Sequence, residues 1–125
     1  MSNIVWGGVL ASPIVKAVLT ALGVSYVIEQ GSDENGNWWR RYSNGWVEQG
    51  GKAVATGEWT VITLPILFSD VNYSVSVTQY LSNRGEWNSN FSTSEHTTSS
   101  FKVWTGSAEN GNGNAAFWEA KSFAA

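Results

Sequence analysis

The pattern of apolar and polar positions changes near residue 25 of this 125-residue chain. Before that point apolar residues cluster without alternation, whereas from Val24 onward apolar and polar residues alternate with a period of two. A period of two is typical of strands that bury one face. The pattern therefore predicts two parts: an apolar N-terminal segment, residues 1–25, and a strand-rich domain, residues 26–125.

The N-terminal segment contains one predicted helix, at residues 13–22. Ser12 is a good N-cap, Pro13 suits the first helical position and Gly23 is a stop signal. Nearly all side chains between them are apolar, except for two polar residues four positions apart that share one face. We expect a helix this apolar to pack on the domain or on copies of itself.

The apolar run at residues 4–28 also has the length of a signal peptide or a membrane span. Two features argue against both readings. No basic region precedes the run, and it is interrupted by Lys16, Pro13 and a pair of glycines at 7–8. We therefore expect no membrane insertion.

The remainder of the chain predicts seven or eight short strands separated by turn signals. Asn35-Gly36 and Asn44-Gly45 favour tight hairpin turns, whereas Gly50-Gly51 predicts a bulge or a break. Pro65 should end a strand or place it at an edge. The predicted strands are 24–30, 38–42, 46–49, 52–57, 58–64, 72–80, 97–105 and 115–123. Strands at this spacing are typical of an all-β antiparallel sandwich or barrel.

The alternation also predicts which side chains share a face. In 72–80, the larger residues Tyr73, Val75 and Val77 should face the core. In 38–42, Trp38, Arg40 and Tyr42 should share one face, with Trp39 and Arg41 on the other.

Composition narrows the class of protein further. Only 14% of residues are charged, the net charge is −3, and 8 of the 125 residues are tryptophan. These values exclude an intrinsically disordered chain and a coiled coil, and they leave no excess of basic residues that would attract nucleic acid. The chain has no cysteine and a single histidine, so it offers neither a thiolate site nor a His-rich site within one chain. We expect no cofactor and no metal site within one chain.

Four blocks of sequence form a specific pattern through their order and spacing. They are WWRRYSNGWVEQGG (38–51), VITLPILFSDVNYSVSVT (61–78), TTSSFKVWTGS (97–107) and FWEAK (117–121). Over residues 26–123 the chain resembles the C-terminal domain of bacteriophage and prophage tail fibres, in particular the gp53-like C-terminal family. One departure is Ser122, which stands where glycine often follows the lysine.

The resemblance implies a homotrimeric β-sandwich knob at the distal end of a tail fibre, in a virion assembled from protein made in the host cytoplasm. The implied partners are the rest of the fibre and a bacterial receptor, either lipopolysaccharide or another glycan, or an outer-membrane protein. A trimer would let helix 13–22 bury itself around a three-fold axis. Two alternatives remain: a trimerisation or collar module that binds no receptor, and a polysaccharide depolymerase.

The loop at 80–96 is the predicted receptor site, because it mixes aromatic rings, amides, carboxylates and an arginine. Rings stack on sugar faces, amides and carboxylates bind hydroxyls, and arginine binds phosphate or carboxylate. In the alternative reading, Trp87 and Phe91 fold back onto the sandwich or fill a subunit interface. The candidate residues are Tyr80, Asn83, Arg84, Glu86, Trp87, Asn88, Asn90 and His96.

The other candidate features are predicted to be structural. We expect the 38–51 block to serve packing, and the GNGN run at 111–114 lacks the lysine and following helix of a phosphate loop. The chain has no GxSxG motif, and its single histidine has only sequence neighbours as partners, so we expect no enzyme. Five tryptophans in predicted strands should pack in the core and in subunit interfaces: Trp38, Trp46, Trp59, Trp104 and Trp118.

Overall fold

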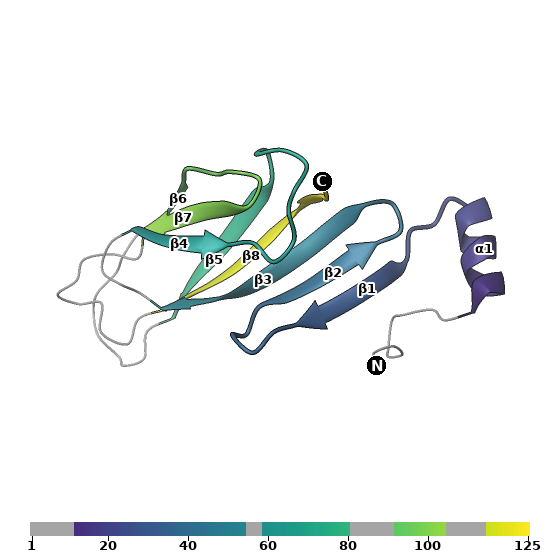
Figure 1. The fold of residues 1–125 in the computed structure, drawn as a ribbon, viewed down its shortest axis with the longest axis horizontal. Helices are drawn as coiled ribbons and strands as arrows, with labels where there is room; N and C mark the ends of the chain where they lie inside the picture. The colour runs from purple at the N-terminus through teal and green to yellow at the C-terminus, as the bar shows by residue number, and fades with distance from the viewer. Residues whose placement is uncertain (1–11, 55–58, 81–91, 105–114) are drawn as a thin grey trace.

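The computed structural model describes residues 12–54, 59–80, 92–104 and 115–125. This part of the chain forms eight strands and one short helix (Figure 1). The elements are α1 (Pro13–Ala21), β1 (Val27–Ser32), β2 (Trp38–Tyr42), β3 (Trp46–Val54), β4 (Trp59–Thr63), β5 (Ser74–Tyr80), β6 (Ser92–Ser94), β7 (Ser100–Trp104) and β8 (Ala115–Phe123). The expectation of an all-β antiparallel sandwich with a short N-terminal helix is confirmed.

The strands form two antiparallel sheets. A five-stranded sheet has the order β1-β2-β3-β8-β5, and a three-stranded sheet has the order β4-β7-β6. The first three strands follow one another as a meander, and the C-terminal strand β8 returns between β3 and β5. In Figure 1 the smaller sheet lies over the β8 and β5 side of the larger one. Strands β1 and β2 therefore extend beyond it.

The two hairpin turns form where the sequence predicts them. Gly36 has a φ of 86° and Gly45 a φ of 92°, values that favour glycine. In the first turn the Asp33 carboxylate accepts hydrogen bonds from the backbone N–H groups of Asn35 and Asn37 and from the Asn37 amide. These hydrogen bonds favour the charged carboxylate and lower the pKa of Asp33, the Asn37 amide contributing most.

The core lies between the two sheets and is built from alternate residues of their strands. Phe68, Phe101 and Val47 are fully buried, and Trp118 packs edge-on against Phe101 with ring centroids 5.4 Å apart. Val75 and Val77 pack against this cluster beside the buried Tyr73, as the alternation in β5 predicts. β4 ends at Thr63, two residues before Pro65, which is also as predicted.

Gln49 is the one fully buried polar side chain among the described residues. Its amide nitrogen donates to the Ile66 carbonyl at 2.9 Å, and its amide oxygen accepts from the Ile66 N–H at 2.8 Å. Ile66 lies on the segment after Pro65, which belongs to no strand and so has no ladder partner for these two groups. The side chain of Gln49 thus supplies the hydrogen bonds that a buried backbone requires.

The hydroxyl of Tyr73 ties β5 to the segment that precedes β7. It lies 2.9 Å from the Thr97 carbonyl and 2.8 Å from the Ser100 carbonyl, either of which can accept the hydrogen bond that the hydroxyl donates. His96 stacks on the Tyr73 ring with centroids 4.8 Å apart, and its Nε2 lies 3.0 Å from the Thr93 hydroxyl. Burial raises the pKa of Tyr73 to about 12.

Tyr73→Phe is expected to remove a stability loss at high pH. An unfolded tyrosine titrates near pH ~10, so between about pH 10 and 12 the unfolded chain has lost a proton that folded Tyr73 still holds. The free energy of unfolding of the wild type therefore falls across this window. The variant lacks that component and should show a shallower slope in urea titrations at pH 9–12. Equal slopes for Tyr73→Phe and the wild type would refute the account.

The helix α1 begins and ends as the sequence predicts, but it packs differently from a core helix. The Ser12 side chain accepts a hydrogen bond from the Val15 N–H, Pro13 opens the helix, and Gly23 adopts a φ of 74°. No residue of α1 is buried. Figure 1 shows the helix beside the N-terminal end of β1, away from the space between the sheets. The sequence predicted that this helix packs either on the domain or on copies of itself. Contact with the domain does not bury it.

Several predicted boundaries need correction. β1 begins at Val27 rather than at residue 24, and β7 begins at Ser100 rather than at 97. Residues 46–54 form one continuous strand, so Gly50-Gly51 neither breaks nor bulges it. β6 lies inside the stretch predicted to be a loop.

Candidate functional site

The outer face of the five-stranded sheet carries a group of charged and aromatic side chains. The pairing register places Trp38, Gly50, Glu119 and Ser76 in one row across β2, β3, β8 and β5. Because side chains alternate along a strand, every second residue from these points faces the same way. We call this the outer face, and its side chains are Trp38, Arg40, Tyr42, Trp46, Glu48, Lys52, Ser74, Ser76, Thr78, Phe117, Glu119, Lys121 and Phe123.

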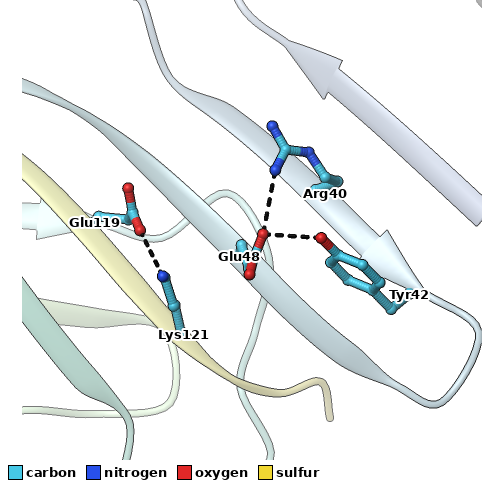
Figure 2. Close-up of polar contacts among 5 residues, drawn as sticks. All are labelled: Arg40, Tyr42, Glu48, Glu119 and Lys121. Carbon is cyan, nitrogen blue, oxygen red and sulfur yellow. Dashed lines mark hydrogen bonds and ion pairs between the residues drawn. The ribbon is translucent and has the colours of Figure 1, made fainter. Parts of the chain in front are cut away.

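A row of opposite charges crosses this face, as Figure 2 shows. Glu48 on β3 accepts hydrogen bonds from Arg40 at 3.2 Å and from the Tyr42 hydroxyl at 3.0 Å, both on β2. On β8, Lys121 pairs with Glu119 at 2.9 Å. These ion pairs are partly solvated, so they contribute little to stability. Their consequence is positional: each pair limits the rotamers of its members.

Lys121 is held in its charged form by this arrangement. The hydrogen bond and the charge of Glu119 raise the pKa of Lys121, and the charge of Glu48 adds to the effect. The outer face thus places three basic side chains, Arg40, Lys52 and Lys121, beside the carboxyl groups of Glu48 and Glu119.

Trp38 lies over Gly50 on the outer face. A Cβ added at Gly50 would approach two atoms of the Trp38 indole at 2.8 Å and the Trp118 carbonyl at 2.6 Å, distances too short for any side chain. On the opposite face Trp39 lies over Gly31 in the same way. These two glycines let adjacent tryptophans lie against opposite faces of one sheet. Gly50 is thus explained by the approach of a ring and not by the predicted bulge.

The predicted split of the 38–42 strand between two faces is confirmed. Arg40 and Tyr42 both reach Glu48, and the Arg40 guanidinium lies 5.5 Å from the centre of the Trp38 ring. On the inner face Trp39 packs against the core cluster, and Arg41 pairs with Glu29 on β1 at 2.7 Å.

A hollow of about 280 Å³ opens on the outer face across β2, β3, β8 and β5. Trp38 and Phe117 lie at its sides, and Glu119, Ser76 and Thr78 supply its side-chain oxygen atoms. Phe117 is 44% exposed, and the Lys52 ammonium lies 5.6 Å from its ring centre. The hollow therefore combines two rings with a carboxylate and two hydroxyl groups.

The expectation that strand tryptophans form the core is wrong for four of the five. Only Trp118 belongs to the core cluster. Trp38 and Trp46 lie on the outer face, and Trp59 and Trp104 face outward from the smaller sheet, where their rings meet edge to face at 5.5 Å. The reason is the period of two, which places these four residues opposite the inward positions of their strands. That these four tryptophans pack in subunit interfaces stays a prediction.

Most of the predicted receptor loop lies outside the described residues. This applies to Asn83, Arg84, Glu86, Trp87, Asn88 and Asn90. The backbone of Tyr80 ends β5, opposite Ala115. His96, 16 residues after Tyr80, is half-buried against Tyr73, so it is a packing partner as well as a loop residue.

Sequence reasoning did not single out the outer face as a candidate site. It assigned residues 38–51 to structure, and it took FWEAK only as a family block. The available signal was the shared alternation of WWRRY, WVEQGGK and FWEAK, each of which places aromatic and charged residues on one face. What could not be read was that β2, β3 and β8 are neighbours, because β8 pairs with β3 across more than sixty residues of chain.

The described ranges contain neither a metal-binding cluster nor a helix that could span a membrane. No group of three or more His, Asp or Glu side chains is placed there to hold a metal ion. No helix among these residues has the length and hydrophobicity needed to cross a bilayer.

Comparison with known proteins identifies the fold. No protein-family model and no curated protein matches the chain. A C-terminal fragment of the R2 pyocin fibre of P. aeruginosa superposes with a TM-score of 0.61 at 16% identity, over 98% of this chain and 33% of that one. An N-truncated R2-type pyocin tail fibre gives the same TM-score and identity, over 98% of this chain and 49% of that one. This chain has a tail-fibre fold.

The tail-fibre resemblance drawn from the four sequence blocks is thereby confirmed. Assignment to the gp53-like family in particular stays a prediction, since no family model matches. The chain spans about a third and about half of the two fibre structures, so it corresponds to one part of such a protein. The superposition covers nearly all of this chain, and it therefore includes α1 as well as the sandwich.

Proposed function

We propose that this domain is the tip of a tail fibre, part of a virion or a related particle, and that it attaches the particle to a bacterial surface receptor. The receptor is lipopolysaccharide or another surface glycan, or an outer-membrane protein. The observation that carries the proposal is the superposition of 98% of the chain on pyocin tail fibres. The outer face supports it, because aromatic and charged groups on a rigid sheet suit recognition.

We also propose that the domain works as a homotrimer joined through α1. Ile14, Val15, Val18 and Leu22 are all exposed and lie within about 100° of one another around the helix. The spacing of the last three, three and then four residues, matches the seam of a coiled coil. A nine-residue helix is marginal in water by itself, so burial of this seam against copies would stabilise it.

The receptor contact is proposed to include the loop residues named from the sequence, Tyr80, Asn83, Arg84, Glu86, Trp87, Asn88, Asn90 and His96. Binding would be non-covalent, with no cofactor and no catalytic step. Three copies per fibre, and several fibres per particle, would raise the avidity of a weak single site without any new contact.

Adsorption to intact bacteria tests this function. Fluorescently labelled protein is sedimented with wild-type cells, with cells lacking lipopolysaccharide outer sugars and with cells lacking porins. We expect saturable binding that one of the two mutants loses. A trimer that adsorbs to no strain of a broad panel would instead favour the collar module. Release of new reducing ends from purified surface polysaccharide would favour the depolymerase.

A further inference from the structure

We propose that the hollow between Trp38 and Phe117 binds one neutral pyranose ring of a surface glycan. This inference rests on the proposed function and adds to it a second contact, built on the sheet and separate from the loop at 80–96. No residue of this hollow belongs to the receptor site predicted from the sequence.

The two rings provide the apolar part of such a site. A pyranose presents a face of C–H groups, which packs on an aromatic ring, and the remaining edge of the sugar carries hydroxyls. The contact with Gly50 limits the movement of the Trp38 indole, and Phe117 stands on β8, two strands away from β2. Both rings are therefore carried by strands in the middle of the sheet, so little freedom is lost on binding.

The polar part of the site comes from β8 and β5. Glu119 and Ser76 lie directly opposite each other in the ladder, and Phe117 and Thr78 form the next outward pair. Glu119 is fixed by its ion pair with Lys121, made through one carboxylate oxygen. A carboxylate has about four acceptor positions, so Glu119 can still accept from sugar hydroxyls. The two hydroxyl side chains can donate or accept.

Size and charge limit the ligand to one neutral ring at a time. Pockets for drug-sized ligands have volumes of about 300–1,000 Å³, and this hollow has about 280 Å³. Its only lining carboxylate, Glu119, is already neutralised by Lys121. A charged sugar would therefore find no unpaired opposite charge among the residues that line the hollow. A neutral pyranose needs none.

The test is a titration of the full chain, labelled with ¹⁵N, with a panel of neutral methyl pyranosides. We expect the indole N–H resonance of Trp38 to shift saturably, with weak affinity. Phe117→Ala and Thr78→Val should each raise the dissociation constant at least about tenfold. The chain offers matched controls: Phe123→Ala changes a phenylalanine of the same strand and face with 48% exposure, and Thr63→Val changes an exposed threonine of the other sheet. Both should bind within about twofold of wild type.

Three outcomes would overturn the inference: no shift at Trp38 with any sugar, equal losses for Phe117→Ala and Phe123→Ala, or preference for acidic sugars. Adsorption to bacteria, measured in parallel, separates the two proposals. If the wild type adsorbs to bacteria but binds no pyranoside, the proposed sugar site is wrong and the tail-fibre function stands. If the wild type adsorbs to no strain, the proposed function fails whatever the titration shows.

Discussion

Replacing Gln49 with leucine is expected to lower the free energy of unfolding by about 2–5 kcal/mol. The variant leaves both the N–H and the carbonyl of Ile66 without the partner that Gln49 supplies. Both groups are in a buried segment, so water cannot replace the amide. Each buried backbone group left unpaired costs about 1–3 kcal/mol, and the apolar leucine recovers only part of this.

Urea unfolding at neutral pH measures this effect. Gln30→Leu is the matched control, because Gln30 lies exposed on the edge strand β1 and should change stability by less than about 0.5 kcal/mol. Gln49→Glu is a useful third variant: its carboxylate can accept from the Ile66 N–H but repels the Ile66 carbonyl, so it should also destabilise. A Gln49→Leu protein as stable as Gln30→Leu would contradict the role of this bridge.

Replacing Val18 with aspartate is expected to separate the subunits of the proposed trimer. Val18 is central to the exposed apolar seam of α1, between Ile14 and Leu22, which are 76% and 70% exposed. Burying a valine side chain contributes about 1.5–3 kcal/mol, and three copies meet at one axis. Three aspartates there would lose that burial and repel one another, so the association constant should fall at least about a hundredfold.

Sedimentation velocity over a range of concentrations measures the change. Thr20→Asp adds the same charge to the opposite side of the helix and should leave the trimer intact. If the wild type is monomeric at all concentrations, or if both variants dissociate equally, α1 is not the contact. The sandwich should stay folded in each variant, since no residue of α1 is buried in it.

The turns, the helix ends and the strand faces were predictable because their determinants are local. Ser12, Pro13 and Gly23 define the helix, and Asn-Gly pairs define two hairpins, each within a few residues of chain. The alternation in β5 likewise predicts the burial of Tyr73 and its neighbours, because the period belongs to one strand.

Features that depend on distant neighbours could not be predicted. Gly50 is required by a ring on β2 and a carbonyl on β8, and Gln49 by a segment 17 residues further along. From the sequence alone, Gly50 predicts a bulge and Gln49 only a hydrogen bond to some neighbouring turn or subunit. The sequence predicts that the five strand tryptophans serve the core and the interfaces but does not divide them, because hydrophobicity alone does not tell an inward position from an outward one; only Trp118 belongs to the core cluster.

The candidate site likewise combines local features that were predictable with long-range pairing that was not. The residue types of the outer face were visible in the sequence, but their meeting depends on β8 entering between β3 and β5. The loop at 80–96 was chosen for its composition, and its central residues lie outside the described part of the chain. The two candidate contacts are therefore of different kinds, one set by loop composition and one by sheet register.

Residue-level footprinting of the protein bound to bacteria tests the central claim most directly. The protein is oxidatively labelled free and on receptor-bearing cells, and the modification of each aromatic side chain is read by mass spectrometry. If the outer face of a tail-fibre tip meets the bacterial surface, Trp38 and Phe117 are protected on cells while Trp59, on the other sheet, is unchanged. Unchanged labelling of Trp38 and Phe117 on cells that clearly bind the protein would contradict the account.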